Sequence, residues 1–245
     1  MTGPTQVGNI SKEAPEIRMR RIYVDRADAG HALAESLLAW RAAPDAVVLA
    51  LPRGGVPVAY EVASALALPL DVLVVRKLGL PSQPELAMGA IASGGAIVLN
   101  RDVLRLLRGS DDALESVRAR ETAELLRRER QYRGDQPPLE MSGRTAIVVD
   151  DGLATGATME AAVRALSALG AKRIIVAVPV ASVEARERVA SVADEVVCPY
   201  TPEYFSAVGQ WYRDFDQTSD EEVRDLLQRA RATLAKPAGR DGGER

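Results

Sequence analysis

Cysteine and histidine are almost absent from this chain of 245 residues, and their scarcity excludes several kinds of site. Cys198 is the single cysteine, so the chain can form no intrachain disulfide and no cysteine-rich zinc site. His31 is the single histidine, which excludes an HExxH helix and a histidine-rich metal site. A Ser-His-Asp triad would need His31, yet no GxSxG segment accompanies it. Any metal chemistry must therefore use oxygen ligands, which favours magnesium or manganese.

A large net charge and long apolar runs are missing too. The chain has 31 Lys and Arg against 34 Asp and Glu, so we expect neither nucleic acid nor an anionic membrane as its partner. The longest apolar run, residues 174–181, is far too short to span a membrane. Residues 1–20 contain no apolar targeting segment, so we predict a cytoplasmic protein with flexible tails at 1–20 and 236–245.

Short apolar runs alternate with segments of helical period along most of the chain. Runs rich in Val and Ile, typical of strands buried on both faces, cover 46–51, 70–75, 146–149 and 174–178, with weaker candidates at 97–99 and 195–197. Helical spacing covers 31–40, 58–66, 159–169 and 183–192. This alternation predicts an α/β fold with a parallel sheet, in which ligands bind at the carboxyl ends of the strands.

The segment 78–144 interrupts the alternation. Within it, residues 110–133 combine six arginines with four glutamates at helical spacing, which predicts a long helix with a charged, solvated face. A basic lip over an anionic ligand is the alternative interpretation of these arginines.

The most specific pattern follows the run at 146–149. Asp150 and Asp151 come directly after the predicted strand, and a loop of small residues leads into a helix; the loop comprises Ala154, Thr155, Gly156, Ala157 and Thr158. Small residues let backbone N–H groups approach an anion, and a helix start adds unpaired donors and a positive dipole end. We interpret the loop as a phosphate site. The aspartates could hold vicinal hydroxyls and water bound to a divalent cation. The acid pair and the loop together therefore predict a sugar-phosphate site, and a plain strand-to-helix turn is the alternative interpretation.

The pattern is neither a GxxxxGK[ST] loop nor a GxGxxG fingerprint. It resembles the signature with which type I phosphoribosyltransferases bind 5-phosphoribosyl pyrophosphate (PRPP), in particular in bacterial members that carry a PRGG segment. The resemblance implies that Asp150 and Asp151 grip the ribose hydroxyls and that residues 154–158 cradle the 5′-phosphate. It extends over roughly residues 46–215.

A second part of the family pattern, LPRGGVPVA, follows the run at 46–51. Gly54 and Gly55 can adopt backbone angles closed to other residues and expose successive N–H groups, while Arg53 offers a planar fork for phosphate oxygens. In the family this loop binds pyrophosphate, often through a non-proline cis peptide, and Arg53 and Gly54 are the best matches. A turn bracketed by Pro and Gly is the alternative.

Three further charged residues follow the run at 70–75. Lys77, one of only four lysines, is a candidate pyrophosphate contact at a strand's carboxyl end, where several type I relatives carry a basic residue. Arg76 takes this place if the strand ends one residue earlier, and an ordinary surface charge is the alternative. Glu85 lies where the family usually has a mobile loop, and could act as a base, as a metal ligand or at the start of a turn.

Aromatic residues are few, yet six of them lie between residues 200 and 215. The family places part of its base-recognising hood after the last strand, so Tyr204, Phe205 and Trp211 are candidates for stacking on a base. A packed subdomain or a dimer contact explains the cluster equally well.

The resemblance implies an α/β fold of the type I phosphoribosyltransferase kind, a mostly parallel five-stranded sheet flanked by helices with a small hood. We expect one domain over residues 21–235. Within it, the hood would come from 21–45 and 200–235, and 78–144 would be an inserted region.

The implied reaction is Mg²⁺-dependent transfer of 5-phosphoribose between PRPP and a nucleobase-like acceptor, with pyrophosphate as the leaving group. Asp150, Asp151, Arg53 and Lys77 would carry it, and the two aspartates would hold the metal through water. The family usually dimerises, so a homodimer is expected. A non-catalytic sensor of PRPP or nucleotides is the alternative function, and a sugar-phosphate hydrolase is a third.

Overall fold

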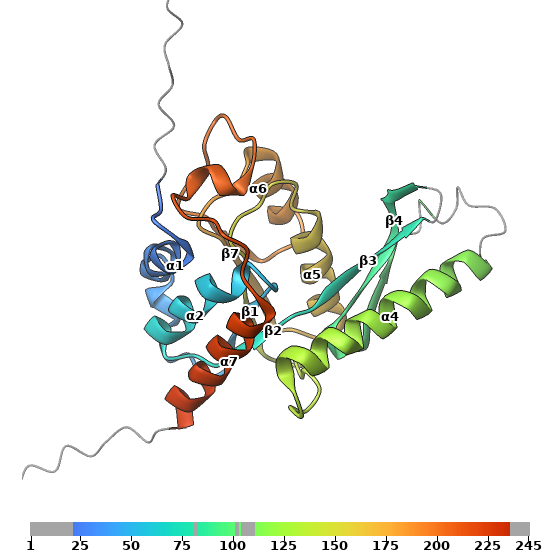
Figure 1. Ribbon diagram of the computed structural model, residues 1–245, viewed down its shortest axis with the longest axis horizontal. Helices are drawn as coiled ribbons and strands as arrows, with labels where there is room; N and C mark the ends of the chain where they lie inside the picture. Colours follow the sequence, from blue (N-terminus) through green and yellow to red (C-terminus); the bar gives the residue numbers. More distant parts are fainter. Residues whose placement is uncertain (1–21, 81–82, 101–102, 104–110, 236–245) are drawn as a thin grey trace, which may run out of the picture.

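A five-stranded parallel sheet forms the centre of the protein (Figure 1). The computed structural model describes residues 22–80, 83–100, 103 and 111–235, so the tails expected at 1–20 and 236–245 lie outside it. The strands are β1 (Ala46–Ala50), β2 (Leu70–Val72), β6 (Thr145–Val149), β7 (Arg173–Ala177) and β8 (Glu195–Val197), in the order β2-β1-β6-β7-β8. The chain order reverses between β1 and β6, and the carboxyl ends of strands at such a reversal border a ligand crevice.

The central strands are buried on both faces, as their unbroken apolar sequences predict. Every residue of β1 and β6 is buried, and the two strands pair in parallel from Ala46 with Thr145 to Ala50 with Val149. Alternate residues of each strand serve opposite faces: Val48 and Ile147 belong to one apolar core and Val47 and Val148 to the other. The predicted parallel α/β sheet is therefore confirmed.

Helices cover both faces of this sheet. The described helices are α1 (Arg26–Glu35), α2 (Gly55–Leu66), α4 (Asp111–Arg133), α5 (Ala157–Ala168), α6 (Val183–Ala190) and α7 (Asp220–Ala235), with short 3₁₀ turns at Leu38–Trp40, Ser93–Gly95 and Val208–Trp211. Of these, α4 lies mainly against β3 outside the central sheet (Figure 1). Buried residues of α1, α2 and α7 share one core, and those of α5 and α6 share the other. In the described residues, none of the helices combines the length and apolarity that a membrane crossing needs.

A second, antiparallel sheet extends from the first. It consists of β3 (Val75–Leu80), β4 (Gln83–Ala92) and β5 (Ala96–Leu99), with α4 running along it (Figure 1). The expected strand at 70–75 is therefore split: β2 ends at Val72. The Leu73 N–H still donates to Ala50 of β1, whereas the Val74 N–H donates to Ser93 Oγ, and the chain enters β3 at Val75. The candidate strand at 97–99 is β5 of this second sheet.

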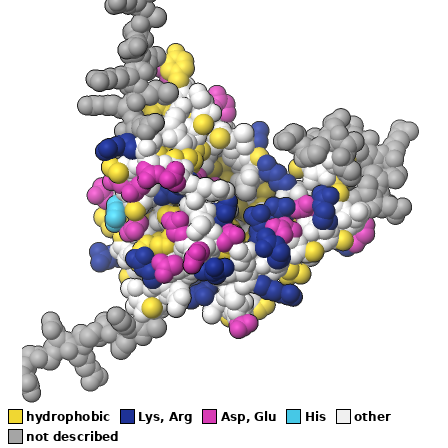
Figure 2. All heavy atoms as spheres, in the orientation of Figure 1, with side chains coloured by type: hydrophobic (Ala, Val, Ile, Leu, Met, Phe, Trp, Pro, Cys, Tyr) yellow, Lys and Arg dark blue, Asp and Glu magenta, His cyan; other side chains and the backbone are white. Residues whose placement is uncertain are grey.

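Helix α4 confirms the long charged helix expected within 110–133. Arg133, at the helix end, forms an ion pair of 2.9 Å with Asp71 of β2, and Glu121 forms one of 2.6 Å with Arg76 of β3. Both ion pairs hold the helix against the strands. Other arginines pair with glutamates of the same helix, as Arg127 does with Glu124. Figure 2 shows Lys and Arg side chains gathered over this part of the surface.

The chain around the start of α1 (residues 22–28) and the chain after β8 (residues 200–218) meet in a small aromatic layer. These ranges are narrower than the expected 21–45 and 200–235, and from here on we call them the hood. Tyr23 forms a parallel bridge with Tyr212, and their rings lie 5.6 Å apart. The Tyr23 hydroxyl donates to Pro179 at 3.0 Å, which joins the hood to the segment after β7. Burial raises the pKa of Tyr23 to about 12.

Helix α1, which extends from the hood, packs tightly on α2. A Cβ atom at Gly30 would lie 2.8 Å from both Glu61 Cβ and the Val58 carbonyl oxygen. We expect Gly30→Ala to lower the free energy of unfolding by about 1–2 kcal/mol because the helices would have to separate. This is the net of a packing cost of about 2–3 kcal/mol and a helix-propensity gain of about 1 kcal/mol from glycine to alanine. Urea denaturation measures it, and an unchanged or higher stability would contradict this packing.

Candidate functional site

The two sequence motifs come together at the carboxyl ends of β1 and β6. A Cβ atom at Gly54 would collide with Asp151 Oδ2 and lie 2.8 Å from Asp151 Cγ, and one at Gly55 would lie 2.9 Å from Asp150 Cα. The PRGG segment and the acid pair are thus in direct contact. The Pro52–Arg53 peptide is cis, the feature that the family resemblance implies for this loop.

The reason for glycine in this loop differs from the expectation. Gly54 has a φ of −61° and a ψ of −31°, angles that any residue adopts, and Gly55 begins α2. Both positions are instead restricted by space, because the backbone and carboxylates of Asp150 and Asp151 lie where a side chain would start. Close approach of the two loops, rather than unusual backbone angles, therefore requires glycine here.

Two neighbouring carboxylates lie in a poorly solvated position. Burial raises the pKa of Asp150 well above its ordinary value, and the charge of Asp151 raises it further. Burial also raises the pKa of Asp151, while the Arg26 guanidinium opposes this rise. The Asp151 N–H donates to Asp150 Oδ1 at 2.9 Å, which fixes the Asp150 carboxylate relative to the backbone of Asp151. A bound cation or several hydroxyl donors would offset this electrostatic cost.

Arg26 is a member of the site that the sequence did not reveal. Its Nε and Nη2 atoms each lie 2.9 Å from Asp151 Oδ2, and its Nη1 donates to the Asp216 carbonyl at 2.7 Å. The guanidinium also lies over the Phe215 ring, 4.0 Å from the centroid. In the sequence Arg26 is one arginine among several near the amino terminus and 125 positions from Asp151, so no local pattern marks it.

The small-residue loop ends in an open helix start. Gly156 precedes α5 with a φ of 72°, a left-handed angle that favours glycine, and has no side chain to cap the helix; the Ala157 N–H lies 3.5 Å from Thr155 Oγ1. Thr155 and Thr158 are exposed beside it, while the Ala154 carbonyl accepts from Ser182 Oγ at 2.9 Å. Helix N–H groups and two hydroxyls thus face solvent at this point, an arrangement suited to an anion.

Arg53 extends toward two helices beside the acid pair. Its Nη1 lies 3.9 Å from Asp220 Oδ1 at the start of α7, and Asp220 accepts a hydrogen bond of 2.6 Å from the Tyr132 hydroxyl of α4. This bond is the main cause that lowers the pKa of Asp220, and burial raises the pKa of Tyr132 to about 12. Arg53 is a third exposed, so its guanidinium is open to a ligand.

Three other candidates are placed differently from the expectation. Lys77 is an exposed residue inside β3 rather than at a strand's carboxyl end, because the strand that was expected to end there is split. Arg76, the alternative to Lys77, forms an ion pair with Glu121. Glu85 falls within β4 and so does not begin a turn, and its side chain lies outside the described part of the structure.

The aromatic candidates differ in their exposure to solvent. Tyr204 is 72% exposed, whereas Trp211 is only 5% exposed, with Tyr200 and Phe205 at centroid distances of 5.2 and 6.1 Å. Trp211 is thus buried among other aromatic rings, whereas Tyr204 is open to solvent, and the stacking role of each stays a prediction. Tyr212, which the sequence analysis did not single out, donates from its hydroxyl to the Asp151 carbonyl at 2.6 Å.

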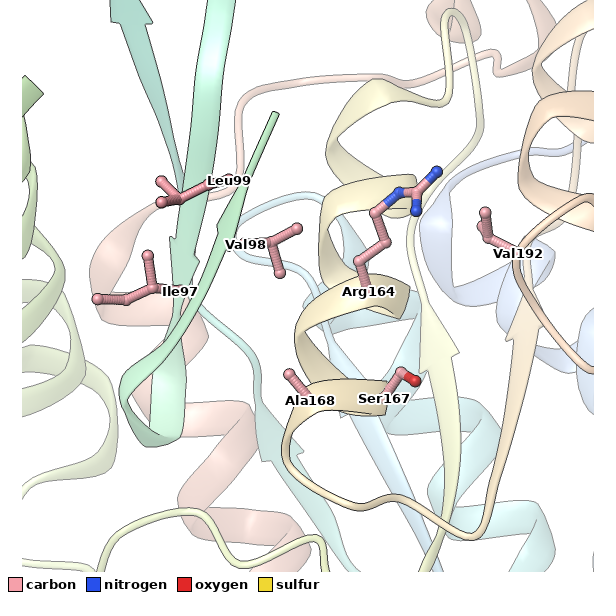
Figure 3. A pocket seen from close by; sticks show the side chains of 7 residues that line it. All are labelled: Ile97, Val98, Leu99, Arg164, Ser167, Ala168 and Val192. Atoms are coloured by element: carbon pink, nitrogen blue, oxygen red, sulfur yellow. The ribbon is translucent and has the colours of Figure 1, made fainter. Parts of the chain in front are cut away.

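A wide groove lies apart from these residues. It has a volume of about 910 Å³ and lies between β5 and α5. Val98 points from β5 toward α5, while Ile97 and Leu99 point to the other side of the strand; the remaining lining residues are Arg164, Ser167, Ala168 and Val192 (Figure 3). None of the residues predicted for phosphate, hydroxyl or base binding lines it. The candidate site is therefore the acid pair and its two loops, not the groove.

The donor set at the acid pair suits a hard cation. In the described residues, no group of three or more His, Cys, Asp and Glu side chains converges, so the protein would supply at most the two carboxylates. Mg²⁺ is commonly held by one or two carboxylates together with water and substrate phosphates. Asp150 and Asp151 therefore fit a magnesium ion that arrives with a phosphorylated ligand.

A parallel sheet whose site loops lie where the strand order reverses is typical of α/β ligand-binding proteins. Comparisons with known proteins identify the family within this class. The family model described as "Phosphoribosyl transferase domain" matches residues 24–214. The crystal structure of TT1426 from Thermus thermophilus is similar at a TM-score of 0.76 and 45% identity, over 84% of this chain and 98% of that one.

Two proteins of Mycobacterium tuberculosis, from strains CDC 1551 and H37Rv, bear the name "Putative phosphoribosyl transferase". Each is 49% identical over 221 residues, which cover 90% of this chain and 50% of the relative. The chain thus spans half the length of these relatives. It belongs to the phosphoribosyl transferase family, and the resemblance to type I members drawn from the Asp150–Asp151 motif is confirmed.

Ionised Asp150 should destabilise the ligand-free protein. The pKa of Asp150 is higher in the folded state than in the unfolded state. At a pH between these two values the folded state binds more protons, so the stability of the protein falls as the pH rises through this range. We expect Asp150→Asn to raise Tm at pH 7 by about 2–4 °C, the shift that about 1 kcal/mol causes at this size.

Asp45→Asn is the matched control because Lys172 lowers the pKa of Asp45, the opposite shift. Its Tm should stay unchanged or fall in the same thermal scans. A lower Tm for Asp150→Asn would show that the carboxylate of Asp150 is stabilising.

Proposed function

We propose that the protein transfers 5-phosphoribose between PRPP and a nucleobase-like acceptor, with Mg²⁺ and with pyrophosphate as the leaving group. The observation that supports this most is the contact of the PRGG loop with the acid pair, next to the open start of α5. A terminal phosphate, a diol and a pyrophosphate would each find suitable partners there. Membership in the phosphoribosyl transferase family supports the same reaction.

The sugar end of PRPP would be held by the strand-to-helix loop after β6. Residues 154–158 would bind the 5′-phosphate through N–H groups of α5 and the hydroxyls of Thr155 and Thr158. Asp150 and Asp151 would accept hydrogen bonds from the two ribose hydroxyls. These contacts fix the position of the reacting carbon, and positioning of this kind supplies a large part of the rate in transfer reactions.

The leaving group would be stabilised from the opposite side of the pocket. Arg53 and the Gly54 N–H are the proposed pyrophosphate donors, and Lys77 on β3 is a proposed further cation. Asp150 and Asp151 would hold Mg²⁺ through water, and the bound ion would supply positive charge to the pyrophosphate. Negative charge grows on the leaving group as its bond to the sugar breaks, so fixed donors aimed there lower the barrier.

The acceptor would enter beside the hood. Exposed Tyr204 and half-buried Phe205 are the proposed aromatic contacts. Base–aromatic stacking contributes about 1–3 kcal/mol per base in nucleic-acid-binding proteins.

Pyrophosphate release from PRPP tests this function. The protein is incubated with PRPP, Mg²⁺ and a panel of purine and pyrimidine bases, and we expect release that depends on one class of base. Asp150→Asn and Asp151→Asn should each reduce the rate by about 100-fold or more, because a charged acceptor of the ribose hydroxyls, and a negative charge that would help to hold Mg²⁺, is lost from the reacting site.

Asp45→Asn is again the control, since Asp45 binds Lys172 and lies just before β1, at the amino ends of the strands and away from the site at their carboxyl ends. Its rate should equal that of the unaltered protein. PRPP binding without release for any acceptor would favour the sensor function, and phosphate release without acceptor would favour a hydrolase. Unchanged rates in both aspartate variants would remove the site assignment.

A further inference from the structure

The Arg26 guanidinium binds three hood and site groups at once. It binds one oxygen of Asp151 through two nitrogens, the Asp216 carbonyl through the third, and the Phe215 ring by its face. The side chains of Arg26 and Asp151 are 13% and 14% exposed, so solvent screens the pair only weakly. A planar guanidinium suits this combination, whereas an ammonium group would satisfy only part of it.

The side chain and the backbone carbonyl of Asp151 make separate contacts. Oδ2 faces Arg26 and Gly54, and the backbone carbonyl accepts from the Tyr212 hydroxyl at 2.6 Å. Among the described residues, no other residue donates a hydrogen bond to Asp151 Oδ1. The hood thus fixes one carboxylate oxygen and the carbonyl, and leaves the second carboxylate oxygen for a ligand.

We propose that Arg26 is a positioning residue for sugar binding: it holds Asp151 through Oδ2 so that Oδ1 meets a ribose hydroxyl, and thereby makes the affinity for PRPP depend on the hood. The inference rests on the proposed function, because it assigns Asp151 to the sugar. Arg26 does not contact the ligand in this arrangement. Its effect passes entirely through Asp151.

Binding to the sugar site and order in the hood are then linked. Arg26 and Tyr212 both belong to the aromatic layer, and Phe215 lies 5.0 Å from Tyr212 between ring centroids. A change that displaces this layer also displaces the carboxylate. The same linkage would let an acceptor that orders the hood strengthen sugar binding, since coupling between two sites is reciprocal.

The chain offers a control at the amino ends of the strands, away from the site at their carboxyl ends. Arg173, the first residue of β7, pairs with Glu195 at 2.9 Å and lies over Trp40, 5.1 Å from the ring centroid. Like Arg26, it combines a carboxylate with an aromatic face. Arg173→Gln removes the same types of contact without touching Asp151.

Titration calorimetry with PRPP and Mg²⁺ provides the test. We expect Arg26→Gln to weaken PRPP binding by about tenfold or more, as the loss of a charge-assisted hydrogen bond to a binding group predicts. Arg26→Lys should recover part of the loss, and Arg173→Gln should stay within about twofold of the unaltered protein. Equal losses in Arg26→Gln and Arg173→Gln would overturn the proposal, because general destabilisation would then explain both.

A double-mutant cycle with Asp151→Asn separates positioning from direct contact. If Arg26 acts through Asp151, adding Arg26→Gln to Asp151→Asn weakens binding little further, so the two losses are far from additive. Additive losses would overturn the proposal and make Arg26 a direct ligand contact. If the unaltered protein fails to bind PRPP at all, the proposed function itself fails, which is a result distinct from either outcome of the cycle.

Discussion

The placement of two carboxylates side by side at the end of a buried strand is the constraint around which the rest of the structure is arranged. Asp150 and Asp151 are poorly hydrated and repel each other, and Arg26 is the cation that offsets the charge of both. Such an arrangement costs stability in the absence of a ligand, and functional sites typically hold groups of this kind. The surrounding loops and the hood limit how the pair can relax, through Gly54 and the Tyr212 hydroxyl.

The topology explains why this site lies where it does. β1 and β6 are neighbours in the sheet but are separated by about a hundred residues, with the second sheet and α4 between them in sequence. Their carboxyl ends are adjacent because the strand order reverses there. The PRGG loop and the acid pair therefore meet without any long side chain to bridge them, and glycine at positions 54 and 55 lets their backbones touch.

Local sequence patterns were enough to predict the central strands, the small-residue loop and its open helix start, because each depends on residues close together in the chain. Arg26 could not be found this way, since its partner Asp151 is distant in sequence. Composition likewise could not distinguish covered Trp211 from exposed Tyr204, and the apolar run at 70–75 concealed the point where the chain passes from β2 to β3. Side-chain burial and changes of sheet depend on tertiary contacts that periodicity does not encode.

A crystal structure with ribose 5-phosphate and Mg²⁺ bound tests the account most directly. We predict the phosphate at the amino end of α5, within contact of residues 154–158, and the sugar hydroxyls on Asp150 and Asp151. A phosphate bound elsewhere, for example in the groove between β5 and α5, with no contact to the two aspartates, would contradict it.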